Sequence, residues 1–372
     1  MHSLLGAVSG LALVLLGVTG ALLVFSEPLD HALFRHLHEV EVRPQRVSLD
    51  ALFEAARARH TSAHTVRVRR FPTCPDQSLE FLIGQVEEGA DGWALEYVNP
   101  YSGAVLGNRS SSTRSGLANP FGFLLSLHST FLIGKKGRLV LGLLSIALLG
   151  SLLSGAIVYR RSVLDVLRWR VRLRARDLML SGSGAHRIVG VWALGFNALI
   201  ASTGFWMARA AFTPAFHRPP PSDVQPALAF SLDRLLEQLG EQAPGFVPAR
   251  MSRVGRKGEA RITGRQVGQL SLLSGTSSHV TFDVQTGAVT RVSLITAAPL
   301  ADQLEAAVQP LHFGTLGGRL TQAGYVAGGL ALPLLSVSGL VLWWRRRRRR
   351  VRGWLRAGTL AARTSSPGAA RS

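Results

Sequence analysis

The sequence has a single cysteine, Cys74, and few charged residues for its length. One cysteine excludes an intramolecular disulfide and a four-cysteine metal site. Charged residues make up only 17% of the 372 residues, whereas hydrophobic residues make up 47%. The sequence also shows no nucleotide-binding glycine loop, no Ser-His-Asp set and no clustered carboxylates, so a hydrolase has no candidate residues. This composition argues against a simple soluble protein.

Long apolar runs dominate the sequence instead. A helix needs about 20 residues to cross a hydrocarbon core of about 30 Å. The first run lacks a basic region before it and ends in Phe-Ser-Glu-Pro rather than a cleavage site, so we interpret it as a retained span and not a signal peptide. We predict an α-helical membrane protein with four transmembrane helices: Leu4–Phe25, Leu139–Tyr159, Ile188–Met207 and Leu320–Trp344.

The distribution of the formal net charge of +20 predicts how these spans are oriented. The connection 160–187 carries eight arginines, and the tail from Arg345 onward carries ten arginines and no acid. The two long connections are nearly balanced, with ten basic and twelve acidic residues in 26–127 and ten and eight in 208–311. By the positive-inside rule, both termini are cytoplasmic and both long connections lie outside a bacterial inner membrane. We interpret the arginine run after Trp343 and Trp344 as a membrane anchor and expect no nucleic-acid partner.

A fixed offset of 184 residues relates the two halves of the chain. His2 and Gly6 in the first run correspond to His186 and Gly190 in the third, and the histidines that precede the second and fourth runs correspond in the same way. Because each half runs in, out and in again, the two repeats are parallel. We therefore predict a tandem duplication.

The repeat divides the chain into eight regions. Each external module is expected to contain an acidic-start helix (Leu49–Arg59 or Leu232–Leu239), short strands (including Thr65–Arg69 and Val280–Val284) and a glycine turn at Gly103 or Gly287. The regions are transmembrane helix 1 (1–25), a first periplasmic module (26–127), helix 2 with its lead-in (128–159), a basic cytoplasmic loop (160–187), helix 3 (188–207), a second periplasmic module (208–311), helix 4 with its lead-in (312–344) and a cytoplasmic Arg-rich tail (345–372).

Four histidines lie at the N-terminal ends of the four spans, and the repeat makes them two equivalent pairs. His2 and His186 belong to the cytoplasmic side, and His128 and His312 belong to the external side. An ionisable residue at membrane depth is costly and usually has a function. Two histidines at matching depth are what a bis-imidazole haem needs. We predict two bis-imidazole haem groups, with one iron held by each pair. The alternative is that each histidine is only an interfacial anchor.

Neighbouring small and basic residues bear on this prediction. The glycines one turn and five turns from each cytoplasmic histidine leave room for a macrocycle, or simply let helices approach closely. They are Gly6, Gly20, Gly190 and Gly204. Lys135 and Arg319 are equivalent through the repeat and either pair with haem propionates or mark the membrane surface. The external group His31, His36 and His38 is a candidate metal or haem site, although a solvated surface cluster is the favoured interpretation.

Three motifs resemble the PepSY-associated transmembrane family over nearly the whole chain. They are His-x3-Gly with a terminal Thr-Gly, Leu-His-x5-Gly-x2-Gly-Arg before the second span, and Ser-Gly-Leu-Val-Leu-Trp-Trp-Arg-Arg in the fourth. The segment Asp283–Val289 is similar to the Asp-x-x-Thr-Gly-x-Val turn of PepSY-type domains, and Asn99–Gly103 is a degenerate copy. The resemblance implies two α+β PepSY-like modules and an iron-regulated inner-membrane protein. It also matches the family's helix-end histidines to His2, His128, His186 and His312.

The resemblance implies a membrane haem-dependent reductase of ferric siderophore or another ferric chelate on the periplasmic side. Its electron donor would be separate, a quinol or a cytoplasmic reductase, and no catalytic side chain is assigned. The alternative is a non-enzymatic PepSY-type module that binds or regulates an external protease, or assists assembly of a membrane complex. A transporter ranks last, because no span contains an interior acid or lysine.

Overall fold

A computed structural model describes residues 2–364 apart from 62, 64, 85–92, 111–118, 169, 171–182, 213–229 and 255–258. Much of the predicted basic loop and the last eight residues of the tail therefore lie outside the described residues. The chain divides into two compact units, one formed by residues 1–21, 140–205 and 325–372 and the other by residues 22–139 and 206–324.

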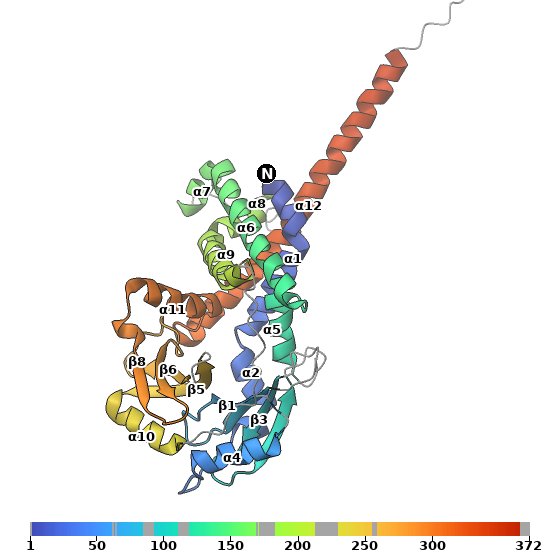
Figure 1. Ribbon diagram of the computed structural model, residues 1–372. Helices are drawn as coiled ribbons and strands as arrows, with labels where there is room; N and C mark the ends of the chain where they lie inside the picture. The colour runs from blue at the N-terminus through green and yellow to red at the C-terminus, as the bar shows by residue number, and fades with distance from the viewer. Residues whose placement is uncertain are drawn as a thin grey trace, which may run out of the picture. The chain divides into compact units, whose positions relative to one another are not determined.

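The first unit consists of helices (Figure 1). Three helical stretches are long and apolar enough to cross a membrane, namely His2–Leu23, Gly134–Val158 and Gly318–Arg349. A bent pair makes a fourth span if its two helices cross together. The helices are α1 (His2–Leu23), α6 (Gly134–Val158), α7 (Arg160–Leu167), α8 (Ser183–Trp192), α9 (Leu194–Ala208) and α12 (Gly318–Thr364). The fold is thus that of a helical membrane protein, with three or four spans by length and composition.

The bend between α8 and α9 was not predicted, because the third apolar run reads as one continuous helix. The two helices meet at 60° around Ala193. Backbone hydrogen bonds continue through the bend, since Ala193 N donates to Val189 O and Asn197 N donates to Ala193 O, each at 2.8 Å. The segment has no proline. Two glycines, Gly190 and Gly195, flank the bend and weaken the local helix.

Glycines allow two close helix contacts in this unit. A Cβ at Gly17 would lie 2.4 Å from Pro333 Cδ, and one at Gly328 would lie 2.5 Å from the Phe196 ring. Close approach is the usual role of small residues between membrane helices, where dispersion forces drive packing. By contrast, Val8 and Leu11 on α1 are each 80% exposed, as expected of apolar side chains that face lipid.

The second unit contains two four-stranded antiparallel sheets with the same strand order, β1-β2-β3-β4 and β5-β6-β7-β8. The strands are β1 (Thr65–Arg70), β2 (Leu79–Gly84), β3 (Trp93–Val98), β4 (Val105–Ser110), β5 (Phe246–Val254), β6 (Glu259–Gln266), β7 (Ser278–Asp283) and β8 (Val289–Ser293). Its helices are α2 (Ser26–Leu33), α3 (Arg35–His38), α4 (Leu49–Arg59), α5 (Pro120–Thr130), α10 (Leu232–Gln242) and α11 (Leu300–Phe313), with short 3₁₀ turns at Arg209–Ala211 and Ile295–Ala297.

The predicted elements of the two sheet modules occur where the sequence placed them. The helix predicted at Leu49–Arg59 has those bounds, and the one predicted to end at Leu239 continues to Gln242. The predicted strands shift by no more than two residues at either end. Gly103 and Gly287 have φ of 73° and 71° in the turns before β4 and β8, and glycine adopts such angles without strain.

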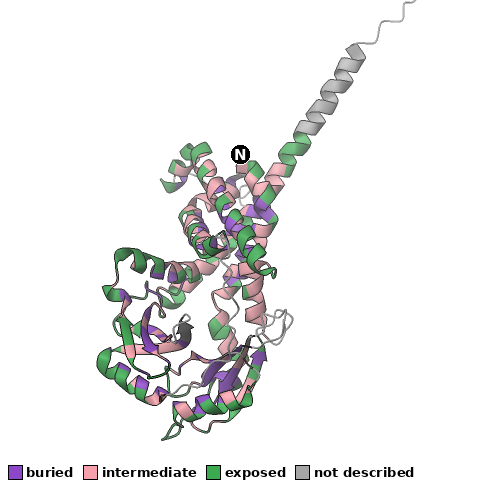
Figure 2. Ribbon diagram, in the orientation of Figure 1, coloured by how far each residue is buried: buried purple, intermediate pink, exposed green. Residues whose placement is uncertain are grey.

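One hydrophobic core joins the two sheets and the helices α4 and α10 (Figure 2). Alternate residues of β1, β2, β6 and β7 enter it, as a strand period of two requires. Phe53 and Phe81 contribute from the first half, and Leu235 and Phe282 contribute from the second. At the edge between the sheets, Phe71 N donates to Ala249 O at 3.0 Å.

The helices α4 and α10 cap each other's N-termini. Asp233 accepts hydrogen bonds from the backbone amides of Leu49 and Asp50, both at 3.0 Å. In return, Asp50 accepts from the Leu232 amide and the Ser231 hydroxyl. The first amides of a helix have no intrahelical partner and favour a negative charge nearby. Each aspartate therefore accepts hydrogen bonds from the first backbone amides of the other helix. It also lies in the first turn of its own helix.

Candidate haem-ligand sites

His2 in α1 and His186 in α8 have ring centres 6.2 Å apart, with an angle of 71° between the rings. Two imidazoles that bind one metal from opposite sides, at about 2 Å each, have ring centres roughly 6 Å apart. His2 Nδ1 lies 2.9 Å from Ser151 O and His186 Nδ1 lies 2.8 Å from Ser338 Oγ. The structure therefore brings this predicted pair together at a separation that suits ligation.

The hydrogen bonds of these rings select a tautomer. A carbonyl oxygen only accepts, so His2 Nδ1 must donate to Ser151 O. The Ser338 hydroxyl donates to Leu335 O at 3.1 Å, which leaves its oxygen to accept from His186 Nδ1. With each Nδ1 protonated, each neutral ring has its lone pair on Nε2. This arrangement is common among metal-ligating histidines, whose other nitrogen donates to the surrounding protein.

Two glycines lie against the two imidazoles. A Cβ at Gly155 would lie 3.1 Å from His2 Cε1, and one at Gly339 would lie 3.4 Å from His186 Cε1. These glycines end the Ser-Gly pairs of α6 and α12 and are related by the 184-residue offset. Because glycine has no side chain, each imidazole ring can pack directly against a neighbouring helix. This contact gives the Ser-Gly pair a structural role in both helices.

Both rings line a cavity of about 290 Å³ in the helical unit. This volume is just below the range of small-molecule pockets, about 300 to 1,000 Å³. Two of the four predicted stripe glycines, Gly6 and Gly190, line it, whereas Gly20 and Gly204 are not among the lining residues. A Cβ at Gly6 would meet nothing within 4 Å. Arg187 and Arg346 also line it and supply positive charge. The donor set and the positive charge suit a flat anionic macrocycle such as haem, whereas the cavity volume lies below the usual range for a small-molecule site.

Asn197 is a cavity residue that the sequence analysis overlooked. It is 1% exposed, and its Nδ2 has no hydrogen-bond partner among the described residues. An unsatisfied amide in an apolar span is costly. The sequence signal for this residue is an asparagine in the middle of an apolar run.

The second predicted pair lies in the sheet-containing unit. His128 near the end of α5 and His312 near the end of α11 have ring centres 6.4 Å apart, with an angle of 54° between the rings. Both helices end with a left-handed residue, Phe131 and Gly314. Burial, with a smaller effect of His128, lowers the pKa of His312 to about 4, so this ring is neutral at physiological pH. A neutral imidazole is the ligating form.

The propionate partners suggested by the sequence remain predictions. Lys135 lies at the start of α6 and Arg319 at the start of α12, as their equivalence through the repeat requires. No group of three or more His, Cys, Asp or Glu side chains with metal-binding geometry occurs among the described residues. That finding does not bear on a haem, whose iron needs only two protein ligands.

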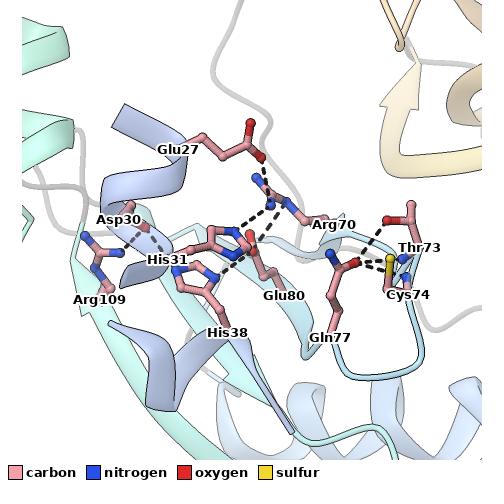
Figure 3. A network of polar contacts seen from close by, with 10 residues as sticks. All are labelled: Glu27, Asp30, His31, His38, Arg70, Thr73, Cys74, Gln77, Glu80 and Arg109. Carbon is pink, nitrogen blue, oxygen red and sulfur yellow. Dashed lines mark hydrogen bonds and ion pairs between the residues drawn. The ribbon is translucent and has the colours of Figure 1, made fainter. Parts of the chain in front are cut away.

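The external group His31, His36 and His38 is not the solvated cluster that we favoured. His36 is exposed, but His38 is 5% exposed, and its ring stacks on His31 at a centroid distance of 4.1 Å. His38 Nε2 lies 3.0 Å from Asp30 Oδ2, which also accepts from Arg109 at 2.8 Å (Figure 3). The cluster is part of a buried charged network because α2 and α3 fold these residues onto the first sheet, a tertiary contact that spacing along the chain does not reveal.

The network in Figure 3 extends to two further charges on the sheet. Arg70 lies 3.4 Å from Glu80 and 3.3 Å from Glu27. Burial alone would raise the pKa of Asp30, but hydrogen bonds from His38 and Arg109 and their charges outweigh it and lower the pKa to about 2. Burial raises the pKa of the neighbouring Tyr97 to about 12. Asp30 is therefore a carboxylate that the fold holds ionised.

Comparison with known proteins gave two findings. The family described as the PepSY-associated TM region matches residues 1–346. An uncharacterized protein of Pseudomonas aeruginosa is similar, at 30% identity over 252 residues, which is 60% of this chain. The matched part covers 63% of that relative's length.

Proposed function

Because the chain belongs to the PepSY-associated transmembrane family, whose match covers residues 1–346, we propose that it is a haem b electron-transfer protein of the bacterial inner membrane. It would reduce a ferric siderophore or other ferric chelate on the periplasmic side. The observation that carries this proposal is the existence of two histidine pairs, separated by 6.2 and 6.4 Å, whose members are related by one offset. Interfacial anchors would have no reason to meet in pairs.

The proposed topology is a tandem duplication of four spans surrounded by lipid, with both termini in the cytoplasm and two PepSY-like modules outside. The equal strand order of the two sheets and the reciprocal caps of α4 and α10 support the duplication. The arginines that follow Trp343 and Trp344 support the orientation, since basic residues next to an aromatic belt favour the cytoplasmic face. A quinol or a cytoplasmic reductase would supply the electrons.

Each side chain of the inner site has a distinct role in this proposal. The Nε2 atoms of His2 and His186 would hold the iron. Ser151 O and Ser338 Oγ fix the ring orientation through Nδ1, and Gly155 and Gly339 leave space for the rings. Arg187 and Arg346 would attract the propionates.

The cofactor itself supplies one-electron chemistry when bound, and the surrounding protein sets its potential and access. A ferric chelate that gains one electron becomes ferrous. Hard oxygen donors hold the ferrous ion less tightly, so reduction releases the iron.

Alanine variants of one member of each pair test the proposal. His186→Ala and His312→Ala should each reduce the haem content of the purified protein from two per chain to one, because each removes a ligand of a different iron. The exposed His36→Ala is the matched control and should retain both. Haem content is measured from the dithionite-reduced α-band.

Two outcomes of that experiment would count against the account. Loss of both haems, or of neither, in a single variant would contradict the assignment of separate pairs. A wild-type protein without a Soret band would leave the non-enzymatic module as the better account, one that binds or regulates an external protease or assists assembly of a membrane complex.

A further inference from the structure

The outer face of the second sheet, which points away from α10, carries unbalanced positive charge. Ala260 and Ile262 of β6 are buried in the core beside α10, so Arg261 and Thr263 alternate onto the outer face. The pairing register places Arg250 opposite Thr263 and His279 on the other side of it. The outer face of this sheet therefore presents basic side chains on successive strands.

The first sheet adds two arginines at the edge where the sheets meet. Arg67 alternates with the buried Val66 and Val68 and so lies on the outer face of β1. The bond from Phe71 N to Ala249 O holds β1 beside β5. Burial, followed by the charges of Arg69 and Arg67, lowers the pKa of Arg250. Burial and Arg69 lower the pKa of Arg67 in the same way. The guanidinium groups are thus close enough to repel one another.

Neutralising acids are scarce around this face. Arg250 donates to the Thr276 hydroxyl at 2.8 Å rather than to a carboxylate. Two acids share this face beside Arg261: Glu259 lies two residues before it on β6 and pairs with Asp283 of β7. The Asp283 carboxylate accepts hydrogen bonds from the amides of its own turn. The ion pairs of the described sheet residues all involve the first sheet.

Buried polar atoms of this face also lack partners. The Arg261 Nε and the Thr263 hydroxyl are buried and have no hydrogen-bond partner among the described residues. Unsatisfied buried donors are rare in native structures, because each one forfeits its hydration without compensation. A bound anion with several oxygens would relieve the repulsion between the arginines, and it would reach these two atoms once the side chains that cover them move aside.

We propose that this outer face, formed by Arg67, Arg69, Arg250, Arg261, His279 and Arg291, binds a multivalent oxyanion, and specifically an anionic ferric chelate with carboxylate oxygens. The proposal rests on the proposed function for the identity of the metal, but the site itself needs no haem. Arginine suits this task because its planar fork matches carboxylate geometry. The same oxyanion chemistry occurs in anionic lipid headgroups, so the test must separate the two sources.

Binding of gallium(III) citrate to the purified full-length protein tests this site, because gallium has the charge of ferric iron and is not readily reduced. Isothermal titration calorimetry should show saturable binding by the wild type. Arg250→Gln and Arg261→Gln should each weaken the affinity by about tenfold to 100-fold, the loss expected for one charged hydrogen bond. Arg250→Lys, which keeps the charge, should retain part of the affinity. Arg234→Gln, on the exposed side of α10, is the matched control and should bind as the wild type does.

Nanodiscs of phosphatidylcholine, with or without phosphatidylglycerol, separate a soluble chelate from a lipid headgroup. Equal binding in both supports the chelate site, whereas loss of binding with phosphatidylglycerol would assign the face to lipid and overturn the proposal. Absence of saturable binding, or equal affinity in Arg250→Gln, Arg261→Gln and Arg234→Gln, would also overturn it. If the purified protein contains haem but does not bind gallium citrate, only this inference is contradicted. Gallium citrate binding without haem contradicts only the proposed electron transfer.

Discussion

The two sheets share a strand order and a core, but the charged side chains on their outer faces are paired differently. In the first sheet, Glu80 and Arg109 join Asp30 and His38 in a closed network of ion pairs. In the second sheet, 184 residues later, Gly264 stands in place of Glu80 and Ser293 in place of Arg109. Arg250 of this sheet donates a hydrogen bond to a hydroxyl group and is repelled by neighbouring arginines. The core sides of the two sheets are alike, whereas their outer sides differ. The difference indicates that the first module uses its charges for stability and the second leaves them available to a ligand.

Loss of one arginine should change the stability of the protein far more on the outer face of the first sheet than on that of the second. Arg109→Ala should lower the free energy of unfolding by about 3–5 kcal/mol, because it takes the buried guanidinium partner away from the partly buried Asp30 carboxylate and leaves only His38 beside it. Arg291→Ala, on the exposed side of β8, should change it by less than about 0.5 kcal/mol. Urea unfolding of the protein in detergent, followed by tryptophan fluorescence, measures both. Equal effects would remove the distinction between the faces.

The two turn glycines should respond unequally to the same change. Both have positive φ, so alanine at either should cost about 1–2 kcal/mol of backbone strain. A Cβ at Gly287 would lie 2.6 Å from the Phe230 ring, whereas one at Gly103 would come no nearer than 3.5 Å to Leu52. Gly287→Ala should therefore destabilise more than Gly103→Ala in the same urea experiment. The reverse order would show that Phe230 moves aside freely.

Acid should destabilise the protein through the first sheet. The pKa of Asp30 is lowered from 3.8 to about 2 in the folded state, so its contribution to stability is complete above pH 4 and is lost as the pH falls towards 2. The expected loss is about 1–2 kcal/mol, after allowance for partial solvation. Asp30→Asn should be less stable at pH 6 but should lose less between pH 4 and pH 2. Identical pH profiles for the variant and the wild type would contradict the assignment of this titration to Asp30.

The reciprocal caps should respond equally, because the two halves are alike there. Asp50→Ala and Asp233→Ala each remove two hydrogen bonds from the start of the opposite helix. Each should cost about 1 kcal/mol, the usual value of an N-terminal cap. Thermal unfolding by circular dichroism would reveal any difference. A twofold larger effect at one aspartate would show that the caps are not equivalent.

Most of the fold could be predicted because it depends on local patterns. Apolar run length predicted three spanning helices correctly, whereas the third predicted run is a bent pair of helices. The acidic start of Leu49–Arg59 predicted a helix with the observed bounds. The common offset predicted which histidines meet, and the ring separations agree with that pairing. Haem ligation by these histidines stays a prediction.

The remaining features depend on contacts between distant residues. The caps connect Asp50 and Asp233 to helices more than 180 residues away along the chain. The burial of His38 depends on α2 and α3 folding onto the first sheet. The bend at Ala193 cannot be predicted from a proline, because the segment has none. The unsatisfied amide of Asn197 can be recognised only from the cavity that surrounds it.

The most direct test of the account is the haem content of the purified wild-type protein, from a pyridine haemochrome assay and the absorption spectrum with and without dithionite. The account predicts two b-type haems per chain, a Soret band and a reduced α-band, consistent with bis-histidine ligation by the 6.2 Å and 6.4 Å pairs. A protein that folds, inserts into the membrane and shows no haem absorption would contradict it.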